Sequence, residues 1–542
     1  MFQPDKPSAK TSQITMNSPK EKTLLSLDHA EITIPDIFSS HGKFRKHQEA
    51  VVCGSVRRTW GDFNDNMNRV ANALLASGAS RGDRVVVMMG NSVEILEVMF
   101  GIVKAGCCVV PLSGLLTGQQ LASLINDCGA TQAFATTDFI ERLRPYQDEL
   151  VHLQENQRYV VHGQAQGWKD YRALTDAQPT DTPNVVYRSE DAFNIIYSSG
   201  TTGLPKGIMQ SHRARVHWAI SNAIEMRFSD RSRALTTTSL YSNGTWLMML
   251  PVLFSGGTCV VMPAFDPMAF SKMVEDEKIT HTFMVPAQFI ALLQTDMDPY
   301  DLSTLEVILC AGSPLRRETK RQVIERMGDK LIELYGFSEG FATMLKPGAP
   351  ADKFDTVGIP VLGFEVRILD ESGLVLGPGE IGEIAGYGPG MMSGYHGKAG
   401  ETAELIWQDE RGRTFIRSGD IGRQDEDGYL TLVDRKKDMI ISGGFNVFPA
   451  DLEEILGQHA DVLDATVIGV PHERWGETPL ALVILRPGAI FDSPSMLSWC
   501  NERLAKHQRL SNIETRPDFP RNALGKVLKR ILREPYWVNA KT

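Results

Sequence analysis

The chain has 542 residues, 42% hydrophobic and 23% charged, and its 66 acidic and 56 basic residues give a net charge of −10. This composition excludes a disordered chain or a fibre, and the negative charge argues against nucleic acid as a bulk partner. The seven cysteines show no CxxC zinc spacing and are too few for a disulfide framework, so we expect a reducing, cytoplasmic compartment.

The first 25 residues are polar and contain no apolar segment of the kind that export signals carry. We therefore expect a disordered leader over 1–25. A cleaved transit peptide is the less favoured alternative, because this segment contains no arginine. The longest apolar region, near residues 98–116, is interrupted by Lys104 and several glycines, so no transmembrane helix is predicted.

Strand and helix patterns alternate through the first 340 residues. The apolar run at 84–89 predicts a strand buried on both faces, and the apolar stripe at 93–100 predicts a helix that Asn91 caps. Gly106 ends this helix, and another strand follows. Further apolar runs occur at 133–136, 159–162, 194–197, 259–262, 306–309 and 331–334. This alternation predicts layered α/β structure with mostly parallel strands.

The pattern changes after Asp355. Glycines and short strands between 357 and 434 predict an antiparallel, β-barrel-like subdomain packed on the α/β body. A helix at 450–456 is predicted from Pro449 before it and the acidic residues in its first turn. We place a hinge at 434–438. The predicted architecture is a large N-terminal α/β domain over 26–434 and a smaller, mobile α+β domain over 435–542.

The segment 197–207, YSSGTTGLPKG, follows an apolar strand and combines glycines, hydroxyl side chains and Lys206. Inward-pointing N–H groups, hydroxyl donors and one ammonium suit the oxygens of a polyphosphate. The segment is not a Walker A loop, because Lys206 is followed by Gly207 where that motif needs serine or threonine. The alternative, a solvated turn, is disfavoured by the buried strand before it. The predicted phosphate-binding residues are Ser198, Ser199, Gly200, Thr201, Thr202, Gly203 and Lys206.

This loop resembles the signature of the adenylate-forming superfamily, which includes acyl-CoA synthetases, luciferases and peptide-synthetase adenylation domains. Further segments match the family's motifs in order: LYGFSE at 334–339, FIRSGD at 415–420, the hinge motif at 434–454 and PRNALGK at 520–526. The resemblance covers at least residues 190–530. The chain is identified as a member of this superfamily, in its acyl-CoA synthetase (AMP-dependent CoA ligase) branch.

The resemblance implies a binding site for ATP and Mg²⁺. The loop from Ser198 to Lys206 would hold the β- and γ-phosphates, and Glu339 would bind Mg²⁺, since a hard cation prefers carboxylate oxygen. Tyr335 would lie against adenine. Ser338 replaces the usual threonine near the α-phosphate. Gly312 belongs to the small-residue loop 311–313, which the family places against adenine and the acyl group.

The resemblance also assigns the ribose and the hinge. Asp420 would accept hydrogen bonds from both ribose hydroxyls. Arg435 would contact the ribose and phosphates, and Lys437 would be the hinge residue. A solvated basic run over 435–437 is the alternative.

Two segments of the C-terminal domain would act in turn. Lys526 would stabilise charge on the α-phosphate and the carboxylate, which makes it catalytic together with Lys206 and Glu339. The basic residues Lys529, Arg530 and Arg533 are expected on the solvated face of a helix at 527–532. The implied pantetheine channel of coenzyme A is formed by Gly443, Gly444 and Phe445. The stretch HERWGE at 472–477 resembles another element of that side, and a capped turn with Trp475 in the core is an equal alternative.

The acid pocket departs from the family pattern, because Ser242 replaces the histidine that many acyl-activating relatives carry. The stretch 239–246 lacks the aspartate of amino-acid-activating relatives, which argues against an amino-acid substrate. Trp246 would shorten the pocket and favour a small, aromatic or medium-chain acid, unless it is core. The candidate walls are Tyr241, Asn243, Trp246, Ala287, Gly312 and Met344.

The resemblance thus implies an ATP-dependent ligase that activates a carboxylic acid as acyl-AMP and transfers the acyl group to coenzyme A. Its co-substrates and cofactor would be ATP, coenzyme A and Mg²⁺. A stand-alone enzyme that loads a carrier protein and a non-catalytic ATP-binding regulator are the alternatives. The identity of the acid is open, as is a homo-oligomeric state.

Overall fold

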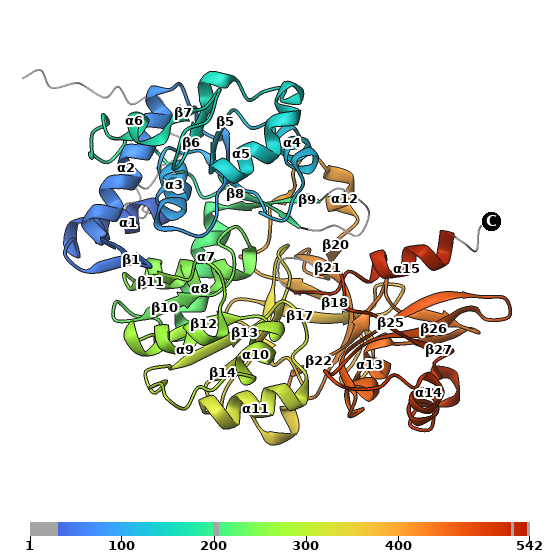
Figure 1. The fold of residues 1–542 in the computed structure, drawn as a ribbon. Coiled ribbons are helices and arrows are strands. Elements are labelled where there is room, and N and C mark those ends of the chain that lie inside the picture. Colours follow the sequence, from blue (N-terminus) through green and yellow to red (C-terminus); the bar gives the residue numbers. More distant parts are fainter. Residues whose placement is uncertain (1–30, 199–204, 522–524, 539–542) are drawn as a thin grey trace, which may run out of the picture. The chain divides into compact units, whose positions relative to one another are not determined.

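The computed structural model describes residues 31–198, 205–521 and 525–538 (Figure 1). The predicted leader and the tip of the predicted phosphate loop lie outside these ranges. Contacts divide the chain into two units, 1–32 and 33–542, and the elements below belong to the second.

An eight-stranded sheet has the order β19-β9-β8-β4-β3-β5-β6-β7, in which β8 to β7 are parallel and β9 and β19 are antiparallel. Its strands are β3 (Arg84–Met88), β4 (Cys108–Pro111), β5 (Gln132–Ala135), β6 (Arg158–Val160), β7 (Lys169–Asp170), β8 (Ala192–Ser198), β9 (Lys206–Ser211) and β19 (Gly394–Tyr395). Alternate residues of β3 enter different cores: Val85 and Val87 pack on one face, Val86 and Met88 on the other. The prediction of a strand buried on both faces is confirmed.

A nine-stranded sheet has the order β16-β15-β14-β13-β12-β10-β11-β1-β2, with parallel pairing from β14 to β1. Its strands are β1 (Glu49–Cys53), β2 (Val56–Thr59), β10 (Arg233–Thr236), β11 (Thr258–Val261), β12 (His281–Met284), β13 (Val307–Cys310), β14 (Leu331–Gly336), β15 (Ala342–Leu345) and β16 (Ile359–Pro360). The predicted layered α/β structure with mostly parallel strands is therefore confirmed.

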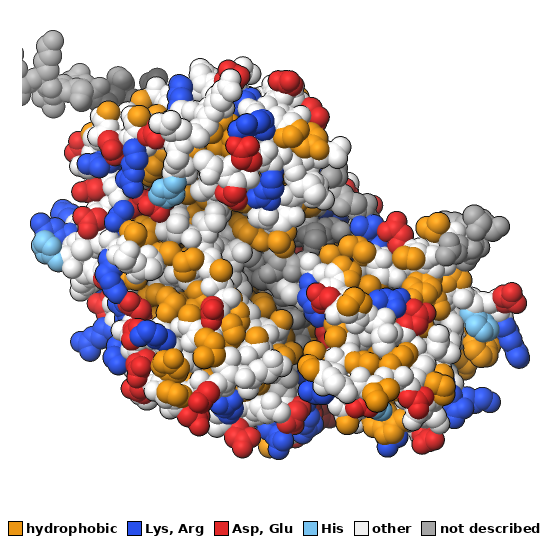
Figure 2. All heavy atoms as spheres, in the orientation of Figure 1, with side chains coloured by type: hydrophobic (Ala, Val, Ile, Leu, Met, Phe, Trp, Pro, Cys, Tyr) orange, Lys and Arg blue, Asp and Glu red, His pale blue; other side chains and the backbone are white. Residues whose placement is uncertain are grey.

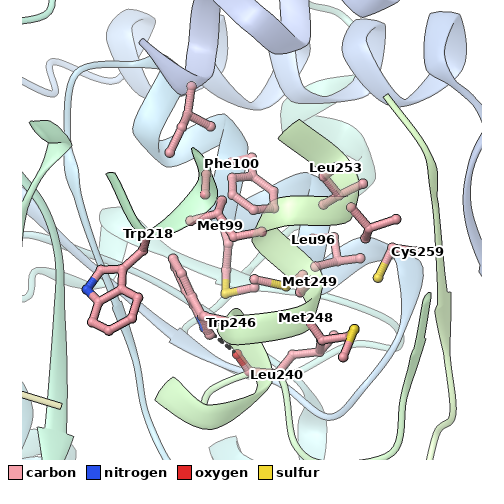
Figure 3. Packing of buried hydrophobic residues seen from close by; sticks show 14 of the residues in the cluster. Leu96, Met99, Phe100, Trp218, Leu240, Trp246, Met248, Met249, Leu253 and Cys259 are labelled. Carbon is pink, nitrogen blue, oxygen red and sulfur yellow. Dashed lines mark hydrogen bonds between the residues drawn. The ribbon is translucent and has the colours of Figure 1, made fainter. Parts of the chain in front are cut away.

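Helices pack against both sheets. The helices of this part of the chain are α1 (Ile34–Phe44), α2 (Trp60–Ala76), α3 (Val93–Lys104), α4 (Gly118–Asp127), α5 (Thr137–Leu143), α6 (Tyr171–Thr175), α7 (His212–Glu225), α8 (Asn243–Phe254), α9 (Pro267–Asp276), α10 (Pro286–Leu293), α11 (Arg317–Met327) and α12 (Ala399–Ala403). One large core is shared by α3, α8 and strands of both sheets, and Figure 3 shows Phe100 beside Trp246 in it.

The helix cap predicted at Asn91 is wrong by one residue. Ser92 is the N-cap, and its hydroxyl accepts a hydrogen bond from the Ile95 amide at 3.3 Å. The Asn91 amide instead donates to the carbonyls of Thr238 and Met262, at 3.1 and 3.0 Å. Asn91 therefore ties the start of α3 to the ends of two strands of the other sheet.

The segment predicted to be antiparallel forms a five-stranded antiparallel sheet with an open, branched order, β17-β18-β21-β20, in which β22 also pairs with β21. Its strands are β17 (Glu365–Leu369), β18 (Gly382–Tyr387), β20 (Ile406–Gln408), β21 (Thr414–Gln424) and β22 (Leu430–Arg435). The predicted hinge at 434–438 spans the end of β22 and the turn after it. The domain division at that point remains a prediction.

The C-terminal segment is α+β. Its strands are β23 (Ile440–Ser442), β24 (Phe445–Val447), β25 (Val462–His472), β26 (Gly476–Leu485) and β27 (Asn512–Thr515), and its helices are α13 (Pro449–Gly457), α14 (Ser493–Asn501) and α15 (Lys529–Val538). The predicted helix at 450–456 is confirmed, with Pro449 as its first residue. The helix predicted at 527–532 instead begins at Lys529 and continues to Val538.

Acidic and basic side chains are interspersed over the face of the molecule in Figure 2. Within the described ranges, no helix has both the length and the apolar composition that crossing a membrane requires.

The two phenylalanines of α1 test the core packing. Phe38 is fully buried, with its ring 4.9 Å from that of Phe100, whereas Phe44 is 72% exposed. Phe38→Ala should lower the free energy of unfolding by about 3–5 kcal/mol, because it removes contacts and leaves a cavity. Phe44→Ala should change it by about 0.5 kcal/mol or less. Urea unfolding of both variants measures the difference, and equal shifts would contradict this packing.

Candidate active site

The carboxylate of Asp420, in β21, joins residues from separate predicted motifs. The Tyr335 hydroxyl donates to its Oδ2 at 2.8 Å, and the Arg435 Nε lies 3.2 Å from its Oδ1. The pairing of β21 with β22 sets Asp420 opposite Arg435, and Tyr335 lies near the end of β14. Both Asp420 and Tyr335 are buried. The fold thus brings together three residues predicted from three motifs.

Lys526 belongs to the same cluster. Burial, and then repulsion from Arg435, lower the pKa of its ammonium to about 7, while Asp420 raises it. Gly525 has a φ of 74°, and a side chain there would reach Ala287 and Val285 at 3.8 Å, so the loop lies close to the start of α10. Near neutral pH, small changes in nearby charge therefore decide whether Lys526 is protonated.

The carboxylate of Glu339 accepts a hydrogen bond from the Tyr395 hydroxyl at 2.8 Å. Burial raises the pKa of this carboxyl, because burial disfavours the anion. Lys206 Nζ lies 2.6 Å from Glu401 Oε2 and 4.8 Å from the centre of the Tyr395 ring. Tyr395 thus contacts both predicted catalytic residues, Glu339 and Lys206.

Sequence reasoning missed Tyr395 and Glu401. Tyr395 reaches the site because β19 pairs with β9, which sets it opposite Ile208. This pairing joins segments almost 190 residues apart, and no motif in the stretch around 395 marked it.

The predicted phosphate loop begins and ends in an antiparallel strand pair, β8 and β9. Ser198 pairs with Lys206 across this hairpin, so both residues lie at the base of the loop. The positions predicted at Ser199, Gly200, Thr201, Thr202 and Gly203 lie outside the described residues and stay predictions.

Two further predicted residues follow strands of the nine-stranded sheet. Gly312, in the loop after β13, is exposed. The backbone carbonyl of Ser338, after β14, accepts a hydrogen bond from Gln210 Nε2 at 2.9 Å.

The basic run at 435–437 is not uniformly solvated. Arg435 pairs with Asp420, and Lys436 Nζ lies 3.0 Å from Glu383 Oε2. Lys437 is exposed in the turn between β22 and β23. Its role as a hinge stays a prediction.

The glycine pair at 443–444 lies beside exposed aromatic rings. Gly443 has a φ of 59°, and its amide donates to the carbonyl of Trp475 at 2.9 Å. Trp475 is 46% exposed and stacks on His472 with ring centroids 4.4 Å apart, while Phe445 is 60% exposed. The alternative that placed Trp475 in the core is therefore wrong.

The residues predicted to form the acid pocket divide into two groups. Tyr241 and Asn243 are partly buried, at the start of α8, and Ala287 is exposed in α10. Trp246 and Met344, each 2% exposed, belong to the hydrophobic core. The Trp246 indole donates to the Leu240 carbonyl at 3.0 Å, as Figure 3 shows.

This burial supports the core alternative for Trp246. Arg215 was not predicted from the sequence, and its guanidinium lies 4.5 Å from the centre of the Trp246 ring.

The prediction that Lys529 and Arg533 lie on a solvated helix face is wrong. Lys529 Nζ lies 2.7 Å from Glu453 Oε1 in α13, and Arg533 lies 2.6 Å from Glu477 in β26. Burial raises the pKa of the neighbouring Asp434 to about 6, while Lys529 opposes that rise. Arg530 alone is exposed, as predicted.

Comparison with family models matches residues 38–396 to the AMP-binding enzyme model and residues 451–526 to the AMP-binding enzyme C-terminal domain. The chain belongs to the AMP-binding enzyme family. It is 32% identical over 495 residues to a feruloyl-CoA synthase of Amycolatopsis sp., covering 90% of this chain and 96% of the relative. It is 33% identical over 477 residues to an indoleacetate–CoA ligase of Aromatoleum aromaticum, and the match covers 86% of this chain and 91% of the relative. This AMP-binding enzyme is thus in the AMP-forming acid–CoA ligase family.

Solved structures agree with this assignment. ATP-bound MatB from Rhodopseudomonas palustris superposes with a TM-score of 0.83 at 26% identity, covering 93% of this chain and 99% of MatB. The anthranilate CoA ligase AuaEII in complex with anthranoyl-AMP gives a TM-score of 0.84 at 25% identity, and the match covers 94% of this chain and 98% of AuaEII. The match extends over both the large N-terminal part and the C-terminal part of this AMP-binding enzyme.

Neighbouring residues in α15 test the corrected C-terminal packing of this AMP-binding enzyme. Lys529→Met should lower the free energy of unfolding by about 2 kcal/mol, because Glu453 loses a charged hydrogen-bonding partner and Asp434 loses a nearby positive charge. Arg530→Met, at an exposed position, should change it by about 0.5 kcal/mol or less. Thermal unfolding of both variants at matched pH measures the effect. Equal stability of the two variants would show that the Lys529 ion pair adds nothing.

Proposed function

We propose that the protein is an ATP-dependent carboxylic acid:coenzyme A ligase that works through an acyl-adenylate. The observation that carries this proposal is the cluster of Asp420, Tyr335, Arg435 and Lys526, which collects one anion, one aromatic ring and two cations at one place. This set of groups suits the ribose, base and phosphates of a nucleotide. The acid–CoA ligases among its relatives support the same reaction.

Each group has a role that its present contacts allow. Asp420 would accept hydrogen bonds from the ribose hydroxyls, with Tyr335 and Arg435 fixing its orientation. Lys206 would leave Glu401 for the β- and γ-phosphates, together with Ser198 and the loop that follows it. The Lys206 ammonium would thus be paired with Glu401 when ATP is absent and with the phosphates when ATP is bound.

The residues present also fit a divalent cation. Glu339 is a carboxylate whose anionic form is disfavoured by burial, and Tyr395 holds one of its oxygens. Mg²⁺ commonly uses one or two protein carboxylates and takes its other oxygens from phosphates and water. When bound, the ion would neutralise phosphate charge. The described ranges hold no group of three or more histidine, cysteine or acidic residues placed to bind a metal ion.

In the first half-reaction, a carboxylate oxygen of the acid attacks the α-phosphorus of ATP, and pyrophosphate leaves. Such transfers depend mainly on positioning and on stabilising charge. The Lys526 ammonium would stabilise charge on the α-phosphate and the acid. A polyanion raises the pKa of a nearby ammonium, so ATP itself would favour the charged form of Lys526.

In the second half-reaction, the thiol of coenzyme A attacks the acyl carbon, and AMP leaves. The exposed rings of Phe445 and Trp475 beside Gly443 offer a surface for the pantetheine chain. Rotation of the C-terminal domain about Lys437 would move Lys526 away from the reacting groups and bring this surface to them. One domain would then serve both half-reactions. The acid itself is proposed to be small, aromatic or medium-chain, which the feruloyl- and indoleacetate-activating relatives support.

The decisive assay is release of pyrophosphate that depends on an added carboxylic acid. Lys526→Ala should reduce this release by at least about 100-fold, because it removes the charge that stabilises the transition state. The same variant should convert supplied acyl-adenylate and coenzyme A to thioester at a rate near that of the wild type. Arg509→Ala, an exposed cation of the same domain, should leave both half-reactions unchanged.

Three results would contradict this proposal. Pyrophosphate release without any acid would argue against an acid ligase. A Lys526→Ala variant with wild-type adenylation would remove the assigned role of that lysine. Activity only with an added carrier protein, and none with coenzyme A, would identify a carrier-loading enzyme instead.

A further inference from the structure

The guanidinium of Arg215, in α7, is a buried cation to which the steps above assign no role. Arg215 is only 3% exposed. Its Nε donates to Asn194 Oδ1 at 2.6 Å, its Nη2 donates to Asn243 Oδ1 at 2.9 Å, and its carbon lies over the Trp246 ring. Every one of these partners is neutral.

A counter-ion for Arg215 is not found in the described part of the chain. None of the ion pairs among the described residues includes it, and the undescribed internal ranges 199–204 and 522–524 contain no aspartate or glutamate. Burial alone lowers the pKa of Arg215, to about 9. An arginine buried without an anion destabilises the fold, so the presence of Arg215 calls for a compensating role.

The position of Arg215 relates it to the proposed acid site. One partner, Asn194, belongs to β8, which leads into the predicted phosphate loop, and the other, Asn243, begins α8 and is a predicted wall of the acid pocket. The hydrogen bonds that Arg215 donates to described residues come from Nε and Nη2, and none of them comes from Nη1. A guanidinium held in this way keeps donor capacity for a carboxylate, whose oxygens match its planar geometry.

We propose that Arg215 binds an anionic group at the far end of the acid, so that the substrate is an acid with a second carboxylate. This inference rests on the proposed ligase function. The reacting carboxylate would lie toward Lys526, and the second carboxylate would be the missing counter-ion of Arg215. Acids that end in a methyl group or an unsubstituted ring would leave the buried cation unpaired. Arg215 would then determine substrate specificity.

Matched pairs of acids test this proposal on the wild-type enzyme. Each pair has one carbon skeleton, linear with three to eight carbons or aromatic, and ends either in a second carboxylate or in a methyl group. Pyrophosphate release gives kcat/KM for each acid. The dicarboxylate of at least one pair should be favoured by at least about tenfold, the preference expected where a buried polar group must be paired. Preference for the methyl-ended acid in every pair would overturn the proposal.

Variants of α7 assign the preference to one side chain. Arg215→Met should reduce the dicarboxylate preference by at least about tenfold, and Arg215→Lys should restore part of it. Arg213→Met, two residues away and exposed beside Glu190, should leave the preference within about twofold of the wild type. An unchanged preference in Arg215→Met would overturn the proposal. The thermal midpoint and the ATP affinity of each variant show whether it is folded. If Arg215→Met is not folded, the acid preference of the wild-type enzyme decides the proposal.

Failure of this inference differs from failure of the proposed function. If no acid of either kind releases pyrophosphate, the ligase proposal fails, and the specificity proposal fails with it. If methyl-ended acids are activated and dicarboxylates are not, the enzyme is a ligase and Arg215 has only a structural role.

Discussion

The buried carboxylate of Asp420 is the constraint on which the site depends. An anion removed from water needs hydrogen-bond donors and positive charge around it, and separate elements supply them. Tyr335 comes from the end of a parallel strand, Arg435 from the neighbouring antiparallel strand, and Lys526 from the C-terminal segment. The α/β body, the antiparallel sheet and the C-terminal part therefore meet in one electrostatic cluster. Loss of Arg435 would remove a positive charge beside Asp420, and loss of Tyr335 would remove a hydrogen-bond donor to it.

Three charged groups of the candidate site would be stabilised by the molecules that we propose it binds. Lys526 has a lowered pKa because burial and Arg435 disfavour its ammonium, and Glu339 has a raised pKa because burial disfavours its anion. Arg215 is buried beside two amides and an indole. A nucleotide polyphosphate, a divalent cation and an anionic acid would each stabilise one of these groups. Binding energy would thus come from stabilising charged forms that burial disfavours.

Local patterns predicted much of the fold and part of the site. Apolar runs marked the parallel strands, and Pro449 with the acids after it marked α13, because both signals lie within a few residues of the element they specify. Tyr395 and Arg215 were missed because their contacts are with other segments of the chain, which no local pattern shows. Lys529 was misassigned for the same reason: its carboxylate partner lies in another helix, and sequence spacing does not show it.

The pH dependence of kcat/KM for ATP shows whether the positive charge of Lys526 drives adenylation. This parameter reports the ionisation of the free enzyme, in which the Lys526 pKa is lowered to about 7. We expect kcat/KM of the wild type to fall above pH 7 as the ammonium loses its proton. Lys526→Arg should be slower but flat from pH 7 to about 9, because guanidinium stays charged. If kcat/KM also fell above pH 7 in Lys526→Arg, or stayed flat in the wild type, the charge of Lys526 would not be what drives adenylation.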